Sequence, residues 1–368
     1  MFIACAGIGF AHRGFETFSR ECFEALRGRD DVRVTLVKGR GPRAPGDLTA
    51  RAPGRDGAVA RVLGRVLGRE PYAIEQLGFS LAMLAPLAIR RPDVVFFSEW
   101  WVGLALARWR RTSRQRFKLL LSNGGLYPPE RLGHVDHVHQ LTPHELARAL
   151  DAGVPAGRQT LLPLGVAIDR ELRTLSPGDR AALRRRLRLP VDRPVAIAVA
   201  ALNRQKRHDH IARELASLPE PRPFLLMLGQ REPETPALEA EVTSVLGEDG
   251  FSIRTVEPRE VARHYRAADA FVLASLWEAF GRVMIEAMSH GLPCLVHDGP
   301  TQRYVLEDEA FTVDMLRPGS LAARLPEVLA EAGDPAAPER RHRFVRERYS
   351  WARVGSRYAE MLKTCAAS

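Results

Sequence analysis

The chain has 368 residues, which is too long for one ordinary domain and suits two domains of about 150 to 190 residues each. Hydrophobic residues make up 45% of it and charged residues 27%, a composition that excludes disordered and fibrous proteins. The formal net charge of +10 favours an anionic partner, such as a sugar nucleotide, a nucleic acid or an acidic lipid surface, but does not choose among them.

Several features bear on the compartment. The four cysteines show neither a CxxC pair nor a zinc-like spacing, so a reducing compartment is expected. Residues 1–7 lack a basic region before their apolar run and are expected to form a first strand, not a signal peptide. The longest apolar run, residues 78–89, is interrupted by Pro86 and is shorter than the ~20 residues that span a bilayer. We therefore expect a cytoplasmic protein, with peripheral contact at the inner membrane face as an open alternative.

Short apolar runs in the first third of the chain are typical of buried parallel strands. They cover residues 2–6, 32–37, 93–97 and 117–121. A glycine-containing loop, residues 7–14, connects the first run to a helical pattern, and such turns can bind phosphate. The loop lacks the G-x-G-x-x-G spacing, so it predicts no dinucleotide site. The third run ends in Ser98-Glu99-Trp100-Trp101, at a position where open α/β sheets place ligands.

The segment between the second and third runs is basic. Residues 39–58 are rich in glycine, proline and arginine and are expected to form a long loop. Residues 59–70 carry arginines every fourth position opposite valines and leucines, which predicts a short amphipathic helix. It would either touch an anionic membrane or cover the domain as an ordinary solvated helix, and its small apolar bulk favours the second interpretation. Glu75 and Gln76, just beyond, are candidate acceptor contacts.

A group of histidines follows the fourth run. His137 and His139 would lie on one face of a strand, with His134 and His144 on either side. Metal binding and the lining of an interdomain cleft are both alternatives to a structural role. No acidic or cysteine partner stands at a zinc-like spacing, so no metal site is predicted.

In the second half, apolar runs alternate with helical patterns, which predicts a parallel, doubly wound sheet. These runs are residues 195–200, 224–228, 251–256, 270–274 and 294–296. The first half has the same organisation, so the fold class is α/β with two Rossmann-like domains. A very basic helix, residues 177–189, precedes the second sheet, and we expect its charged face to be solvated.

Residues 268–293 carry the clearest chemistry. A polar turn after the 270–274 run contains Glu278, and a helix that begins at Arg282 contains Glu286. Backbone N–H groups at the start of such a helix bind phosphate. Carboxylates on both sides of a diphosphate site suit a ligand with hydroxyls at both ends. A nucleotide-sugar is such a ligand.

The segment Glu278-Ala-Phe-Gly-Arg-Val-Met-Ile-Glu286 closely resembles the signature of the family-4 (group 1) retaining glycosyltransferases, which have the GT-B fold. By this resemblance, Glu278 would hold hydroxyls of the donor sugar and Glu286 would hold the ribose. The diphosphate would lie against the start of the helix, at Phe280, Gly281, Arg282 and Val283.

The resemblance extends to other segments. Arg13-Gly14-Phe15-Glu16 stands in place of a Gly-Gly-x-Glu pattern, in which Gly14 would let the backbone approach the donor phosphates. Lys206 matches a phosphate-binding lysine of the family, whereas Ala201 occupies the position of the usual arginine. Arg204 is the nearest substitute for that arginine. Asn123 stands where many members have a histidine facing the donor sugar, which puts that contact in doubt.

The family organisation implies three parts. Residues 1–168 would form the acceptor-side domain and residues 169–345 the nucleotide-sugar domain, with the two facing each other across a cleft. Residues 346–368 would form a helix that crosses back to the first domain, with Trp351 as its packing anchor.

The sequence therefore predicts a retaining glycosyltransferase of the hexosyltransferase type that uses a nucleotide-sugar and needs no metal or other cofactor. Lys206 and Arg204 would stabilise the departing diphosphate, and Glu278 would position the sugar. The alternatives are a nucleotide-sugar epimerase, a non-catalytic nucleotide-sugar-binding protein and a nucleic-acid-binding protein. The last would explain the positive charge but not the two glutamates, so no nucleic-acid partner is expected. The base, the sugar and the acceptor, whether glycan, lipid or small molecule, are not identified by the sequence.

Overall fold

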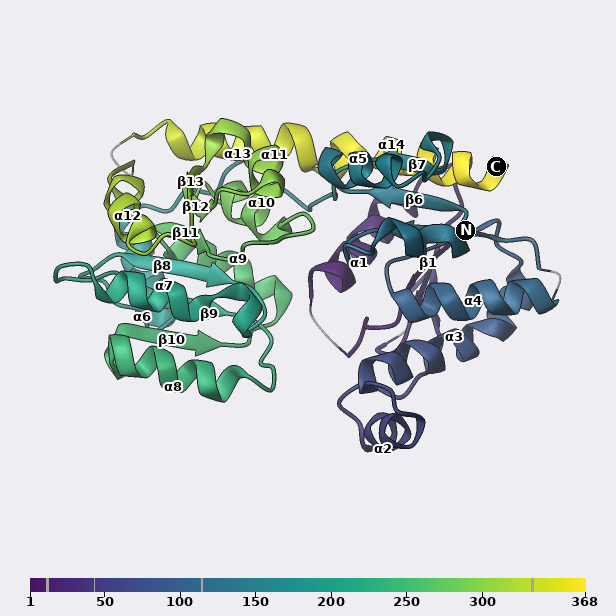
Figure 1. Ribbon diagram of the computed structural model, residues 1–368. Coiled ribbons are helices and arrows are strands. Elements are labelled where there is room, and N and C mark those ends of the chain that lie inside the picture. Colours follow the sequence, from purple (N-terminus) through teal and green to yellow (C-terminus); the bar gives the residue numbers. More distant parts are fainter. Residues whose placement is uncertain (11–12, 43, 114, 332–333) are drawn as a thin grey trace. The chain divides into compact units, whose positions relative to one another are not determined.

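The computed structural model describes residues 1–10, 13–42, 44–113, 115–331 and 334–368. Residues 11 and 12 of the predicted glycine-containing loop and residue 43 of the predicted long loop lie outside the described residues. The chain forms two compact units, shown in Figure 1. Unit 1 comprises Met1–Gly165 and Trp351–Ser368, and unit 2 comprises Val166–Ser350.

Unit 1 is built on a sheet of parallel strands in the order β3-β2-β1-β4-β5-β6-β7. These strands are β1 Phe2–Cys5, β2 Thr35–Lys38, β3 Asp47–Thr49, β4 Val94–Phe97, β5 Lys118–Ser122, β6 His137–Gln140 and β7 Gln159–Leu161. The order reverses its direction between β1 and β4, which makes this position the topological switch point of the sheet. In open α/β sheets, ligands bind at the carboxyl ends of the strands beside such a point.

Helices cover both faces of this sheet. They are α1 Gly14–Leu26, α2 Ala58–Leu67, α3 Pro71–Arg90, α4 Trp100–Ser113, α5 Pro143–Asp151, α14 Trp351–Ala367 and the 3-10 turns η1 Pro129–His134 and η2 Ala156–Arg158. Because successive side chains of a strand point to opposite faces, β1 contributes to two cores. Ile3 and Cys5 pack in the core that α1 and α14 cover, and Phe2 and Ala4 pack in the core that α3 and α4 cover.

Helix α14 belongs to unit 1 and is held by aromatic contacts. The ring of Trp351 stacks on Phe18 at a centroid distance of 5.8 Å, and its indole N–H donates to a Glu21 carboxylate oxygen at 2.9 Å. Tyr358, which is fully buried, donates its hydroxyl to the carbonyl oxygen of Pro163 at 2.9 Å. Trp351 is therefore a packing residue of this helix, as the sequence predicts.

Helix α3 is longer than the sequence predicts. The interruption expected at Pro86 does not occur, and the helix continues through this residue over 20 residues. Within the described ranges, α3 alone is long and apolar enough to cross a membrane by length and composition. Within its most apolar window, however, 44% of the helix is buried inside the protein, and Phe79 and Met83 belong to the core of unit 1. A core helix of a soluble protein has the same properties.

Helix α2 is largely solvated, as the favoured interpretation of the sequence expects, but its large apolar side chains are exposed as well as its arginines. Of its residues, all of which the structure describes, only Ala60 and Gly64 are buried. A Cβ atom on Gly64 would lie 2.6 Å from the carbonyl oxygen of Arg69, so glycine allows the chain to turn closely over the end of the helix. Its large apolar side chains are 40–75% exposed; they are Val59, Val62, Leu63, Val66 and Leu67.

Unit 2 is built on a second parallel sheet, in the order β10-β9-β8-β11-β12-β13, with its switch point between β8 and β11. The strands are β8 Val195–Val199, β9 Phe224–Leu228, β10 Phe251–Arg254, β11 Ala270–Leu273, β12 Cys294–His297 and β13 Phe311–Val313. The first five coincide with the predicted runs. Strand β13 is only partly buried, so its sequence gives no comparable apolar signal. The predicted class of two doubly wound, parallel-sheet domains is confirmed.

The helices of unit 2 alternate with these strands. They are α6 Pro177–Arg186, α7 His208–Ala216, α8 Thr235–Leu246, α9 Pro258–Ala267, α10 Arg282–Ser289, α11 Pro300–Leu306, α12 Ser320–Ala330 and α13 Ala337–Tyr349, with 3-10 turns η3 Arg204–Lys206, η4 Glu248–Gly250 and η5 Glu307–Glu309. The prediction that the charged face of α6 is solvated is wrong for Arg184. This side chain is buried, donates to the carbonyl oxygen of Ala267 at 2.8 Å and pairs with Asp269. It therefore fixes α6 to the start of β11.

Candidate functional site

The loops after β8 and β11 lie at the switch point of the unit 2 sheet, and each carries one member of an ion pair. Lys206 ends the short turn η3 after β8, and Glu278 lies in the turn between β11 and α10. The Lys206 Nζ atom lies 2.7 Å from Glu278 Oε1, and the Ser275 hydroxyl donates to the same oxygen. Both charged side chains remain partly exposed, 19% for Lys206 and 12% for Glu278, so a ligand can reach them.

The Phe280-Gly281 pair of the motif shapes this turn. Gly281 has a φ of 75°, in the left-handed region that favours glycine, and a Cβ atom there would lie 2.2 Å from Met284 Cε. The ring of Phe280 is 2% exposed and packs edge-on against Tyr349 at 5.8 Å. The Phe280 side chain therefore belongs to the core, and a ligand contact at this position would have to come from the backbone.

Glu286 is oriented by Arg282. The Arg282 side chain is 5% exposed, and its Nε–H donates to Glu286 Oε1 at 3.0 Å. On the preceding helix, α9, burial raises the pKa of Tyr265, and the charge of Glu286 raises it further. The Tyr265 hydroxyl donates to the carbonyl oxygen of Val283 at 3.4 Å, and 26% of the Glu286 side chain remains exposed.

The predicted diphosphate residues lie on neighbouring loops. Arg282 and Val283 begin α10, where the backbone N–H groups of the first turn have no intrahelical acceptor. Arg204 is exposed on the same short turn as Lys206, and its backbone N–H donates to Glu234 Oε2 at 2.8 Å. The structure thus places Lys206, Arg204 and the start of α10 beside one switch point, as expected for groups that bind one anion.

Gly14, the remaining predicted nucleotide-sugar residue, lies in unit 1. It is the first residue of α1, and no atom of the described residues lies within 4 Å of the position that a Cβ atom would occupy. The backbone is therefore open at this point, which is what the prediction requires. Its role in donor binding stays a prediction.

Asn123, which stands at the position of a family histidine, has two hydrogen-bond partners in unit 1. Its side-chain amide donates to Gln140 Oε1 at 3.1 Å, and its Oδ1 accepts from the backbone N–H of Tyr127 at 2.8 Å. The side chain is 2% exposed, so it fixes the turn after β5.

The histidines of β6 have protein partners. His137 Nε2 lies 2.7 Å from the Thr160 hydroxyl, and His139 Nε2 lies 2.8 Å from the carbonyl oxygen of Leu162. Burial lowers the pKa of His139 to about 4, so it is neutral at physiological pH. Both side chains thus stabilise the β6–β7 part of the sheet. Within the described ranges, no group of three or more histidine, cysteine, aspartate or glutamate side chains lies close enough to hold a metal ion.

The sequence analysis did not identify a buried group of charges at the switch point of unit 1. Arg55 donates from Nε to both carboxylate oxygens of Glu75, at 3.1 and 3.0 Å, and lies 3.9 Å from Glu16. Glu75 is fully buried, so it is not the acceptor contact that its sequence position suggested. Gln76 is also buried, and its side-chain oxygen accepts from the backbone N–H of Trp101 at 2.9 Å.

Glu99, at the carboxyl end of β4, belongs to the same group. Its Oε1 accepts from the backbone N–H of Ala6 at 2.7 Å, whereas its Oε2 is buried with no hydrogen-bond partner within the described ranges. Burial, and secondarily the charge of Glu16, raises the pKa of Glu99 to about 7. The sequence predicted that Glu99 lies at the end of a strand. It did not predict that the Glu99 side chain points into the protein and is buried.

Comparisons with known proteins agree with this geometry. Residues 179–351 match the family model described as "Glycosyl transferases group 1". The chain is similar to a D-inositol 3-phosphate glycosyltransferase of Geodermatophilus obscurus, with 29% identity over 327 residues, 78% of this chain and 70% of the relative. It is also similar to the enzyme of that name from Mycobacterium tuberculosis, with 28% identity over 336 residues, 80% of this chain and 65% of the relative.

Two solved structures share the fold over almost their whole length. Sucrose-phosphate synthase from Thermosynechococcus elongatus has a TM-score of 0.80 at 20% identity and covers 100% of each chain. Anabaena HepE in complex with UDP-glucose has a TM-score of 0.74 at 14% identity and covers 99% of each chain. The family match, the relatives and the fold agree with the resemblance carried by Glu278, Glu286 and Lys206. Residues 179–351 thus match the group 1 glycosyltransferases, and the whole chain has the GT-B fold.

Proposed function

We propose that the protein is a retaining hexosyltransferase that moves a sugar from a nucleotide-sugar to an acceptor hydroxyl without a metal cofactor. The observation that carries the proposal is the Lys206–Glu278 ion pair at the switch point of unit 2, beside the start of α10. A neighbour of the same fold, HepE, was solved in complex with UDP-glucose, and another, a starch synthase, was solved bound to ADP. Nucleotide-sugar binding by this chain is therefore a well-supported proposal.

In this proposal, the charges of unit 2 act on the leaving group. The bond between the anomeric carbon and the diphosphate breaks while the acceptor oxygen bonds to the same carbon from the same face, and the proton of the acceptor hydroxyl passes to the departing diphosphate. Lys206, Arg204 and the N-terminal dipole of α10 stabilise the negative charge that grows on the diphosphate. These positive groups supply the stabilisation that a metal ion gives in other transferases. Glu278 orients the sugar hydroxyls, and Glu286 accepts hydrogen bonds from the ribose.

Titration calorimetry with UDP, GDP and ADP and their common sugar conjugates tests donor binding. We expect micromolar binding of one nucleotide, and a Kd about 10- to 100-fold higher in Glu286→Gln. The reason is that a hydrogen bond to a charged group contributes about 1.5–3 kcal/mol. Glu248→Gln, an exposed glutamate on η4, is the matched control and is expected to bind as wild type does. Failure of the wild type to bind any of these nucleotides would contradict the proposal.

Product analysis distinguishes the alternatives. A non-catalytic binding protein would bind the donor but would not release nucleotide with any acceptor. An epimerase would convert the donor sugar, with no acceptor present, to an isomer of equal mass, which sugar chromatography detects. A transferase consumes the donor in proportion to the acceptor added.

We also propose that α2 contacts an anionic membrane from the cytoplasmic side. Its five exposed apolar side chains would enter the headgroup boundary, and Arg61 and Arg65 would meet anionic lipid headgroups. The helix contains no acidic residue, so nothing on it repels such a surface. Exposed valines and leucines beside arginines, in a helix that contacts its own domain through alanine and glycine, favour this partner over bulk water.

Vesicle co-sedimentation tests the membrane proposal. We expect binding to vesicles with about one-third phosphatidylserine and much weaker binding to pure phosphatidylcholine. Replacing Val62 and Val66 together by serine is expected to lower the partition coefficient about tenfold or more, because two apolar side chains leave the interface. Val191→Ser, on a similarly exposed valine of unit 2, is the control. Equal binding of all three proteins, or binding independent of lipid charge, would show that α2 is not the contact.

A further inference from the structure

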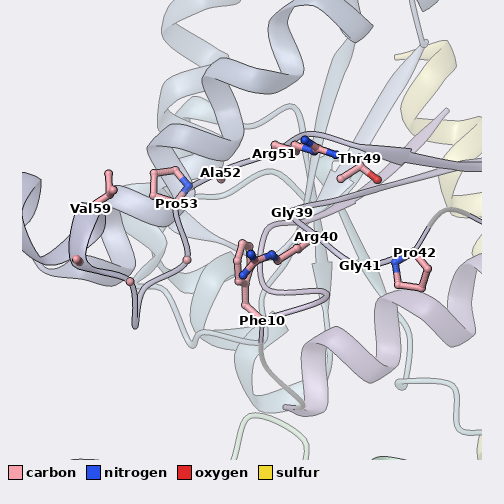
Figure 2. Close-up of a pocket in the computed structure, with 13 residues that line it drawn as sticks. Phe10, Gly39, Arg40, Gly41, Pro42, Thr49, Arg51, Ala52, Pro53 and Val59 are labelled. Atoms are coloured by element: carbon pink, nitrogen blue, oxygen red, sulfur yellow. The ribbon is translucent and has the colours of Figure 1, made fainter.

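Unit 1 contains a hollow of about 820 Å³ beside the ends of β2 and β3. Figure 2 shows its lining: Phe10 from the loop after β1, residues 39–42 after β2, Thr49 at the end of β3 and residues 51–54 after it. Residues 57–59, at the start of α2, complete the rim. A hollow of this size holds a sugar phosphate or a lipid headgroup with its first carbons, and it is larger than a lone anion needs.

The charge of the lining is positive. Among the thirteen described lining residues are Arg40 and Arg51, and there is no aspartate or glutamate. The Arg40 guanidinium lies 5.6 Å from the centroid of the Phe10 ring, and its backbone N–H donates to the carbonyl oxygen of Ile8 at 3.0 Å. The chain around Arg40 is therefore held in place while its side chain remains exposed. In Figure 2, Arg51 and Thr49 lie along another wall of the hollow.

The buried carboxylate of Asp47, in β3, already has a positive partner. Asp47 pairs with Lys38, and both side chains are fully buried. The Lys38 ammonium also donates to the carbonyl oxygen of Pro42 at 2.6 Å, which ties the wall of the hollow to the sheet. The charges of Arg40 and Arg51 thus remain for a ligand.

Two further features suit an anion. Helix α2 begins at the rim with Gly57 as its N-cap, no capping side chain and no acidic residue in its first turn, so its positive dipole end is not neutralised. Glycines also allow the loops that line the hollow to approach their neighbours closely. A Cβ atom at Gly39 would lie 2.2 Å from the carbonyl oxygen of Ala6, and one at Gly54 would lie 2.7 Å from the Phe10 ring. The loops keep their close approach because these residues have no side chain.

We propose that this hollow binds a phosphate group carried by the acceptor. Arg40 and Arg51 each offer planar donors that match phosphate oxygens, and Phe10, Pro53 and Val59 provide apolar surface for the rest of the molecule. The phosphate belongs either to a soluble sugar or polyol phosphate or to a lipid headgroup. The assignment to the acceptor rests on the proposed transferase function, whereas the binding of phosphate does not.

The test measures phosphate binding with the donor site already occupied. The full chain is saturated with its cognate nucleotide, so that Lys206 and α10 are unavailable, and is then titrated with inorganic phosphate, glycerol 3-phosphate and a hexose 6-phosphate. A second arm uses vesicles that contain phosphatidic acid, compared with phosphatidylserine vesicles of equal charge. Arg40→Gln and Arg51→Gln are compared with Arg90→Gln, an exposed arginine at the far end of α3.

We expect each of Arg40→Gln and Arg51→Gln to raise the Kd for a phosphate-bearing ligand about tenfold, and Arg90→Gln to leave it unchanged. A loss confined to the soluble ligands identifies a soluble phosphate, and a loss confined to phosphatidic acid vesicles identifies a lipid headgroup. No phosphate binding by a protein that still binds its nucleotide, or binding that neither variant weakens, overturns this inference alone. Absence of nucleotide binding overturns the transferase proposal instead. The phosphate titration is then carried out on the protein without nucleotide, and it still tests whether the hollow binds phosphate.

Discussion

Lys206→Met is expected to reduce kcat by about 10²–10³-fold, the loss typical when one preorganised group that stabilises transition-state charge is removed. In the resting protein, the Lys206 ammonium lies 2.7 Å from Glu278, so it already occupies the switch point where the diphosphate is proposed to leave. The interaction strengthens as charge develops on the leaving group, so kcat is expected to fall more than KM rises. Steady-state kinetics with the cognate donor measure both parameters.

The Lys206–Glu278 ion pair allows the two residues to be tested singly and together. Glu278→Gln is expected to lower kcat with the donor while leaving the Kd of the bare nucleotide unchanged, because Glu278 is assigned to the sugar. The double variant should lose less than the product of the two single losses, since the two residues act as one unit. Lys363→Met, on the surface of α14, is the control. Full activity of Lys206→Met would remove this residue from the mechanism.

Glu99→Gln is expected to stabilise unit 1 above neutral pH and to change little at pH 5. Burial raises the pKa of Glu99 to about 7, above the ordinary value of 4.5, so the folded protein binds a proton more tightly than the unfolded chain does. This contribution to stability is present below about pH 4.5 and is lost as the pH rises through 7. At pH 8, the ionised buried carboxylate costs about 3 kcal/mol, at about 1.4 kcal/mol per pKa unit. Glutamine at this position carries no such charge.

Urea unfolding followed by tryptophan fluorescence at pH 5, 6.5 and 8 measures this effect. Four of the five tryptophans, at positions 100, 101, 109 and 351, lie in unit 1, so the signal reports mainly on that unit. Glu70→Gln, on an exposed glutamate next to α3, is the control. A difference between Glu99→Gln and wild type that is the same at all three pH values would contradict the assignment.

Local sequence patterns predicted the fold class and the first five strands of the unit 2 sheet because buried parallel strands are short, continuous apolar runs. They also predicted the turn and helix around Glu278 and Glu286, since these positions are close in sequence. The contact between Lys206 and Glu278 could not be predicted in the same way, because the two residues are 72 positions apart and meet only through the strand order. The resemblance to the family identified both residues as site residues but did not show that their side chains form an ion pair.

Other features depend on tertiary packing that no local pattern reveals. Arg184 belongs to a run of arginines that suggests a solvated surface, yet it is buried because Asp269 faces it. The carboxylate of Glu75 looks like a ligand contact until Arg55 is placed against it. The sequence predicted α2 as an amphipathic helix, but it did not show that Ala60 and Gly64 would be its buried residues. For the two charged residues, the partner comes from a distant part of the chain.

The placement of α14 has a consequence for biosynthesis. Unit 2 is one continuous segment, Val166–Ser350, whereas unit 1 needs α14, which is translated after all of unit 2. Until Tyr358 and Leu362 emerge from the ribosome, the core around Phe18 and Phe96 lacks one of its layers. Unit 2 can therefore complete its fold first, while the earlier-made unit 1 waits in an incomplete state. A chaperone that recognises exposed apolar surface would thus find its binding site on the nascent N-terminal segment, and ribosome profiling of chaperone-bound nascent chains would show release only after α14 has been made.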